Sequence, residues 1–196
     1  MPHVVLMELA ADAVRSLLPR TGRAVVGITG PVGAGKSTLA ARLSGCIIST
    51  DHYLPDYEAT PVAERDLPQR SDLTRLLADL RSLRAGRPTR VPQWSFHTHS
   101  RVGELEVHPS DLIIVEGLHA LHDTHAPGID LRVYIDAPPD IRWSRWEHLA
   151  LTGQRGWGVE ETRTFFDTVA EPTFNTHAPA YRSGAHIIVS NAVQQG

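Results

Sequence analysis

The chain has 196 residues, with 19 basic and 22 acidic side chains and a formal net charge of −3. Its length suits a substantial core, so residues 1–196 are expected to form a single domain. The slightly acidic balance gives no sign of a nucleic-acid partner, and no apolar run reaches membrane-spanning length. The one cysteine, Cys46, is expected to be a buried thiol in a reducing compartment, which indicates a cytoplasmic protein.

Residues 1–22 are expected to form an N-terminal helical extension, with a helix over residues 4–18. The stretch "MPHVVLMELAADAVRSLLPR" has acidic residues among its apolar residues. This pattern is typical of an amphipathic helix and not of a signal peptide.

The next segment carries the most specific motif of the chain. A strand candidate at 24–29 is followed by G-x-x-x-x-G-K-[ST], from Gly30 to Ser37, and by a helix candidate at 37–43. This is the context of a loop that binds nucleotide phosphates. Lys36, the only lysine in the chain, is expected to reach the β- and γ-phosphates, and Ser37 to offer its hydroxyl to Mg²⁺. The residues expected to hold the nucleotide are Gly30, Gly33, Ala34, Gly35, Lys36, Ser37 and Thr38.

Short apolar runs alternate with helical patterns along the rest of the chain. Further strands are predicted at residues 46–50, 112–116, 131–136 and 186–190. Further helices are predicted at residues 72–84, 139–151 and 160–169. The alternation predicts an α/β fold of three layers, a phosphate-loop NTPase of the kinase type with a mostly parallel five-stranded sheet.

Acidic residues follow two of the predicted strands. In parallel sheets, ligands bind where the strands end, so Asp51 and Glu116 are expected to lie near the phosphate loop. The alternatives left open are a turn cap for Asp51 and a surface acid for Glu116. Asp136 also ends a strand, but the sequence "DAPPD" favours a role in capping the next helix.

The motifs that are missing narrow the class of protein. A GTPase would carry Asn-Lys-x-Asp to read guanine, and no second lysine exists to form it. A transport ATPase would carry Leu-Ser-Gly-Gly-Gln, and "LSGC" at residues 43–46 is incomplete and too early. A small-molecule kinase needs only the loop, metal ligands, a base, arginines and an acceptor pocket.

Residues 86–110 are long and without helical periodicity, which is typical of a functional segment. "TRVPQWSF" and "GELEVH" are predicted to pair as a hairpin on the acceptor side. Such a hairpin would bring aromatic rings and polar groups together, as a small-molecule site requires. A surface hairpin with a small core of its own is the alternative.

Taken together, these segments resemble the uridine kinase and phosphoribulokinase family of phosphate-loop kinases. The resemblance runs over residues 24–190 through "GITGPVGAGKST", "STDHY", "QWSFHTHSR", "LIIVEGLHAL", "IDAPPDIRWSR" and "EPTFNTHAPAYRSGAHIIV". It implies ATP as donor, a small hydroxyl compound as acceptor, Asp51 as base and Glu116 near the metal. It places a helical lid at residues 138–158, where Arg142, Arg145 and Arg155 would neutralise the transferring group. The residues implied for the acceptor side are Asp51, Tyr53, Gln69, Trp94, Phe96, His99, Arg101 and Arg155.

The chain also departs from the family's pattern. Trp94 and Ser95 stand where tyrosine and aspartate are usual, and Gln69 in "DLPQRSD" replaces a carboxylate that would hold ribose hydroxyls. In the lid, Trp146 and Trp157 stand where arginine is expected. These departures predict that uridine and cytidine are poor acceptors.

His119, His122 and His125 are spaced three residues apart. A metal site is conceivable there, but side chains at this spacing rotate around a helix, and Pro127 and Gly128 soon interrupt it.

The sequence therefore predicts a kinase in which Lys36 and the loop hold ATP, Ser37 and Glu116 position Mg²⁺, and Asp51 activates the acceptor. A sugar or vitamin precursor as acceptor, and a regulator that binds nucleotide without catalysis, are the alternatives. The oligomeric state is left open, with a homo-oligomer compatible with the sequence.

Overall fold

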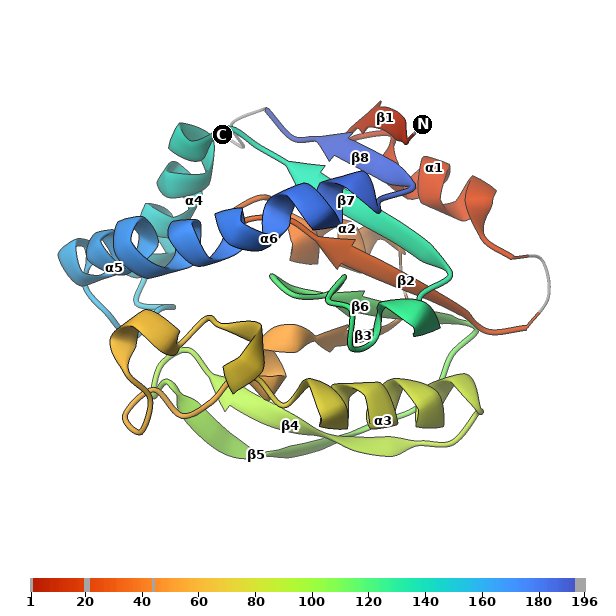
Figure 1. Cartoon of the computed structure of the whole chain (residues 1–196), viewed down its shortest axis with the longest axis horizontal. Helices are drawn as coiled ribbons and strands as arrows, with labels where there is room; N and C mark the ends of the chain where they lie inside the picture. Colours follow the sequence, from red (N-terminus) through yellow and green to blue (C-terminus); the bar gives the residue numbers. More distant parts are fainter. Residues whose placement is uncertain (1, 20–21, 44, 193–196) are drawn as a thin grey trace.

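The computed structural model describes residues 2–19, 22–43 and 45–192. Within them, six parallel strands form one sheet in the order β1-β8-β7-β2-β6-β3 (Figure 1). Their bounds are β1 His3–Leu6, β2 Ala24–Thr29, β3 Cys46–Ser49, β6 Leu112–Glu116, β7 Leu131–Asp136 and β8 Ile187–Ser190. The predicted α/β architecture is confirmed, with one strand more than the five expected.

The extra strand comes from the N-terminal segment, where the prediction of a helix from residue 4 was wrong. Residues His3–Leu6 form β1, which pairs in parallel with β8, and helix α1 covers only Ala10–Leu17. The run "HVVL" contains two β-branched residues, which suit a strand. Because β8 offers an unpaired edge, this tertiary partner decides the conformation of a segment whose spacing also fits a helix.

The sheet is covered by helices on both faces, as the three-layer prediction requires. Alternate residues of a strand point to opposite faces. In β2, Val26 and Ile28 pack with α1 and with α2, Lys36–Leu43, whereas Val25 packs with the other face. That other face is covered by α3, Leu73–Arg84, and by α6, Glu171–Ser183, which crosses in front of the strands in Figure 1.

The C-terminal helices extend further than the sequence indicated. Helix α4 spans Pro139–Leu151 as predicted, and α5 spans Val159–Phe165. A π-helical turn, Phe166–Ala170, then leads directly into α6. The predicted helix at 160–169 therefore continues past residue 169, and Pro172 lies in the first turn of α6, where a missing N–H is tolerated.

The predicted hairpin is confirmed. Strands β4, Thr89–Ser95, and β5, Ser100–Val107, pair antiparallel with a register shift between Gln93 and Trp94. In Figure 1 the hairpin lies beside α3, apart from the main sheet. None of the described helices is long and apolar enough to cross a membrane.

Asp79 of α3 joins the hairpin to the segment that follows β3. Its carboxylate accepts hydrogen bonds from the Tyr53 hydroxyl at 2.8 Å and from the Thr89 hydroxyl at 2.5 Å. Asp79 is only 6% exposed and Tyr53 is fully buried, so water could not readily satisfy the Tyr53 hydroxyl if the carboxylate were removed.

We expect Asp79→Ala to lower the free energy of unfolding by about 2–4 kcal/mol, because the buried Tyr53 hydroxyl and the half-buried Thr89 hydroxyl lose their partner. Urea denaturation followed by circular dichroism measures this loss. Asp123→Ala, in an exposed loop, is the matched control and should change stability by less than about 0.5 kcal/mol. Equal effects of the two changes would contradict the role assigned to Asp79.

Candidate active site

The loop between β2 and α2 is built on glycines in conformations that other residues avoid. Gly30, Gly33 and Gly35 have φ angles of +156°, +71° and +100°. A side chain at Gly30 would collide with the carbonyl oxygen of Ile135, and one at Gly33 would lie 2.5 Å from the carbonyl oxygen of Arg142. The loop therefore needs glycine both for its shape and for its contact with β7 and α4.

Lys36 begins helix α2, and its ammonium group turns back onto the loop. The Nζ atom donates hydrogen bonds to the carbonyl oxygens of Gly30 and Pro31, at 2.9 and 3.0 Å. Burial lowers the pKa of Lys36, while the charges of Glu116 and Asp51 act in the opposite direction. The cation is thus held inside the protein by weak neutral partners, which a phosphate group could replace.

Glu116 ends β6, the strand next to β2, and is only 6% exposed. Its carboxylate accepts a hydrogen bond from the Ser37 hydroxyl at 3.2 Å. Burial, and then the nearby Asp51, raise the pKa of Glu116. A hydroxyl and a carboxylate that face each other at the loop match the oxygen ligands of Mg²⁺, so the residues present fit this ion.

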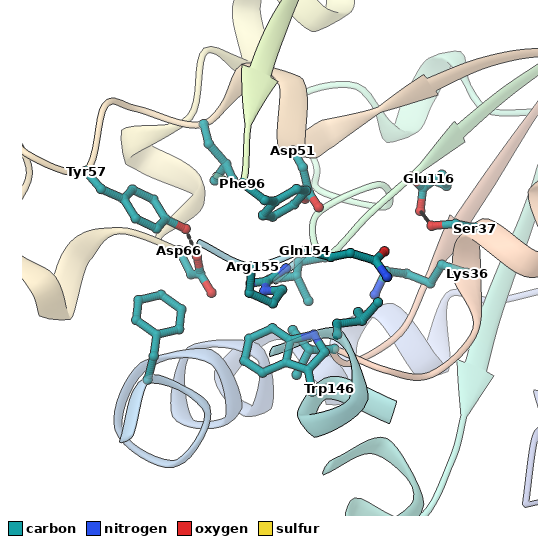
Figure 2. Close-up of a pocket in the computed structure, with 15 residues that line it drawn as sticks. Lys36, Ser37, Asp51, Tyr57, Asp66, Phe96, Glu116, Trp146, Gln154 and Arg155 are labelled. Carbon is teal, nitrogen blue, oxygen red and sulfur yellow. Dashed lines mark hydrogen bonds between the residues drawn. The ribbon is translucent and has the colours of Figure 1, made fainter. Parts of the chain in front are cut away.

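Asp51 follows β3, which pairs with β6 so that Ser49 lies opposite Glu116. The Ser49 hydroxyl accepts a hydrogen bond from the Asp51 backbone N–H at 3.3 Å. The structure brings Lys36, Asp51 and Glu116 to one cavity, as the convergence of strand ends predicts (Figure 2).

This cavity has a volume of about 260 Å³. In Figure 2 the phosphate loop and Glu116 lie at one end, Tyr57 and Asp66 lie at the other, and Arg155 lies between them. The lining residues are Val32, Lys36, Ser37, Asp51, Leu54, Tyr57, Asp66, Phe96, Glu116, Leu118, Trp146, Leu149, Gln154, Arg155 and Phe165.

The sequence and the fold resemble known proteins over most of the chain. Residues 25–195 match the Phosphoribulokinase / Uridine kinase family. The chain is 31% identical to the uridine kinase of Clostridium botulinum, over 84% of this chain and 86% of that protein, and 29% identical to that of Lactobacillus helveticus, over 84% and 85%. A solved structure entitled a "Possible Uridine Kinase" from Bacillus stearothermophilus has a TM-score of 0.61, with 18% identity over 93% of this chain and 96% of that chain.

The chain belongs to the Phosphoribulokinase / Uridine kinase family. It is a phosphate-loop kinase of the uridine kinase type, and the resemblance found in its motifs is confirmed. The residues predicted for the acceptor side and the lid differ in whether they line the cavity.

A buried carboxylate, Asp66, lines the cavity three residues before Gln69. Gln69 is exposed and does not line the cavity, so its predicted place on the acceptor side is not seen in this conformation. Asp66, three residues earlier in "DLPQRSD", is 4% exposed and accepts a hydrogen bond from the Tyr57 hydroxyl at 2.9 Å. Gln69 lies within the 3₁₀ turn Pro68–Arg70 and Asp66 lies before it, a difference that the linear sequence pattern does not show. Burial raises the pKa of Asp66 to about 6.

Among the hairpin residues expected at the acceptor, Phe96 lines the cavity and three others do not. Trp94 is 6% exposed and donates its indole N–H to the carbonyl oxygen of Pro55, so it packs behind Phe96 and Tyr57. His99 is buried against the ring of Trp157. Arg101 is exposed on β5.

Tyr53 was also expected at the acceptor and lies elsewhere. It is fully buried, and its hydroxyl bonds Asp79 on α3. The 3₁₀ turn Thr50–Tyr53 sends Asp51 to the cavity and Tyr53 to the core.

Two of the three predicted lid arginines lie on helix α4 and contact the phosphate loop from outside the cavity. Arg142 is 4% exposed, forms a two-pronged ion pair with Glu171 of α6, and donates to the carbonyl oxygen of Val32 at 3.3 Å. Arg145 donates to the carbonyl oxygen of Gly33 at 2.8 Å. Neither residue lines the cavity, so their predicted contact with the transferring group is not seen in this conformation.

Asn191, which the sequence did not single out, contacts the phosphate loop. It lies just after β8, accepts a hydrogen bond from Arg145, and donates its side-chain N–H to the carbonyl oxygen of Ala34 at 2.8 Å. Its position at a strand end, in "VSNA", is the signal that could have identified it.

Arg155 is the lid arginine that lines the cavity. Its guanidinium carbon lies 4.4 Å from the ring centres of both Phe96 and Trp146. Burial lowers the pKa of Arg155, while Asp51 acts in the opposite direction. Stacking on two rings holds the group in place and leaves its edge available to a ligand.

The histidines and Asp136 serve the fold. His119 shares hydrogen bonds with the Tyr181 hydroxyl and the Asp66 carbonyl oxygen, at 3.0 and 2.7 Å. Within the described ranges, no three metal-binding side chains form a group that could hold an ion. Asp136 pairs with Arg182 at 2.6 Å, and Pro138 precedes α4 without a side-chain cap, so the predicted capping role was wrong.

The pKa of Asp66 predicts a pH dependence of stability. Because its pKa is about 6 in the folded protein and 3.8 in the reference state, the folded state binds more protons between these values, and stability falls as pH rises through them. Asp66→Asn has no such group, so the variant should gain up to about 3 kcal/mol relative to wild type between pH 4 and pH 6. Urea denaturation at several pH values measures the difference, and parallel pH profiles would contradict the assignment.

The ion pair of Arg142 and Glu171 predicts a large effect on stability. Glu171→Met leaves a buried guanidinium without its partner and should cost about 3–5 kcal/mol of unfolding free energy. Asp167→Met, which breaks the exposed pair with Arg163, is the matched control and should cost no more than about 1 kcal/mol. Chemical denaturation of both variants provides the comparison, and a cost for Glu171→Met as small as the control's would show that the buried pair does not brace the loop.

Proposed function

We propose that the protein transfers the γ-phosphate of ATP to a hydroxyl group of a small molecule. The observation that carries this proposal is the single cavity lined by Lys36, Asp51 and the Ser37–Glu116 pair, with a second carboxylate, Asp66, at its far end. A phosphate-binding cation, a base, a pair of metal ligands and an acceptor pocket are the parts that phosphoryl transfer requires.

The loop residues would hold the nucleotide. Backbone N–H groups of residues 33–38 and the ammonium of Lys36 would bind the phosphates, at the positive end of helix α2. Ser37 and Glu116 would hold Mg²⁺, which supplies positive charge to the phosphate oxygens when bound. Arg145 and Asn191 fix the loop through the carbonyl oxygens of Gly33 and Ala34, which keeps its N–H groups directed toward the ligand.

Two carboxylates divide the work on the acceptor. Asp51 would accept the proton of the attacking hydroxyl, and Asp66 would accept hydrogen bonds from further hydroxyls of the same molecule. Arg155, held between two rings inside the cavity, would place positive charge beside the group being transferred. A regulator that only binds nucleotide would need neither the base nor the second carboxylate.

Asp51→Asn should lower turnover by about two to four orders of magnitude, because the amide cannot accept the proton, while ATP binding is largely retained. Radiolabelled transfer to a panel of hydroxyl compounds measures turnover, and calorimetry measures ATP binding. The matched control is Asp56→Asn, an exposed residue of the same segment that is outside the cavity lining. Near-normal turnover of Asp51→Asn would leave Asp51 as a turn residue only.

A further inference from the structure

The tip of the hairpin and the end of the lid form a stack of aromatic side chains. The ring of Trp157 lies parallel to that of His99, with 3.9 Å between ring centres. The ring of Tyr57 lies parallel to His99 on a centre distance of 5.5 Å, and Phe165 lies 5.0 Å from Trp157. A flat ring of a ligand would normally seek faces such as these.

The backbone holds the lid against the hairpin at this point. Gly156 has a φ angle of +71°, and a side chain there would lie within 2.8 Å of the carbonyl oxygen of Phe96. His99 also has a positive φ angle, +51°, which places its ring in the stack. Both conformations are unfavourable for most residues, so they indicate that the stack is a specified feature of the fold.

The stack limits the space left for an acceptor. Of the residues that the structure describes, neither Trp157 nor His99 lines the cavity, which reaches Tyr57 and Phe165 but not the rings behind them. Its volume of about 260 Å³ lies below the range of about 300–1,000 Å³ typical of small-molecule sites. This space has to accommodate both the transferring phosphate and the acceptor.

The polar groups of the cavity favour a molecule with several hydroxyls. Asp51 and Asp66 both face the cavity, and Tyr57 supplies one hydrogen bond to Asp66, which leaves that carboxylate able to accept more. Leu54, Leu149 and other apolar side chains form the remaining walls. A short hydroxylated chain or ring matches two carboxylates that line a small, partly apolar space.

We propose that the acceptor is a compact polyhydroxylated compound without an aromatic base, and that Trp157 excludes the base of a nucleoside by filling its place in the stack. This inference rests on the proposed kinase function and specifies its acceptor. The sequence departures predict that uridine is a poor acceptor because Gln69 replaces a carboxylate. Under the present proposal, the cause is instead steric exclusion of the base by Trp157.

The test compares uridine with methyl β-D-ribofuranoside, which keeps the ribose and replaces the base by a methoxy group. Wild-type protein should use the ribofuranoside with a kcat/KM at least about tenfold above that for uridine. Trp157→Ala should raise kcat/KM for uridine by at least about tenfold and change that for the ribofuranoside less than about threefold. Trp143→Ala removes a lid tryptophan that packs on Phe166 outside the cavity, and should leave the ratio unchanged.

Binding of both compounds, and of glycerol and erythritol, is measured in parallel by calorimetry with a non-hydrolysable ATP analogue and Mg²⁺ present. Trp157→Val serves if the alanine variant does not fold. The inference is overturned if wild-type protein prefers uridine, if neither Trp157 variant gains uridine binding, or if none of the compact hydroxyl compounds binds. Failure of the kinase function is distinguished by the absence of phosphoryl transfer to every compound, uridine included, and binding still decides the acceptor class in that case.

Discussion

The site depends on a half-buried cation, Lys36, at the junction of three strands. A charge taken out of water is costly unless it is paired and hydrogen-bonded. Lys36 is held by two carbonyl oxygens of its own loop, with Glu116 and Asp51 contributing favourable charge nearby. Parallel strands end at the same edge, so the order β2-β6-β3 brings these residues together without any long side-chain reach. The same arrangement that balances the lysine charge also supplies the metal ligands and the base.

The phosphate loop is braced by elements distant in the sequence. Arg142 and Arg145 of α4 bond loop carbonyl oxygens, Glu171 of α6 neutralises Arg142, and Asn191 after β8 bonds Ala34. The N–H groups of this loop must face a ligand, so other parts of the protein can fix the loop only through its carbonyl oxygens. Arg142, Arg145 and Asn191 donate hydrogen bonds to these carbonyl oxygens. We infer that the C-terminal helices, which look remote from the chemistry, set the rigidity of the nucleotide site.

Much of this organisation could be predicted from the sequence, because it is encoded locally. The phosphate loop has an unambiguous spacing, and the acids at 51 and 116 follow recognisable strands. The misplaced residues depend on tertiary contacts. The linear sequence does not show that Gln69 is exposed in the 3₁₀ turn Pro68–Arg70 while Asp66, just before this turn, is buried in the cavity wall. Likewise, no local signal pairs Arg142 with Glu171, stacks Trp157 on His99, or offers β8 as the partner of residues 3–6.

We expect the Lys36 ammonium to exchange its loop carbonyl partners for nucleotide phosphate oxygens when ATP binds. A crystal structure with a non-hydrolysable ATP analogue and Mg²⁺ tests this most directly. The account predicts that the Lys36 ammonium leaves the carbonyl oxygens of Gly30 and Pro31 for phosphate oxygens, with the Ser37 hydroxyl bound to the ion and Glu116 beside it. A nucleotide bound elsewhere, or a Lys36 that keeps both carbonyl contacts with the analogue in place, would contradict it.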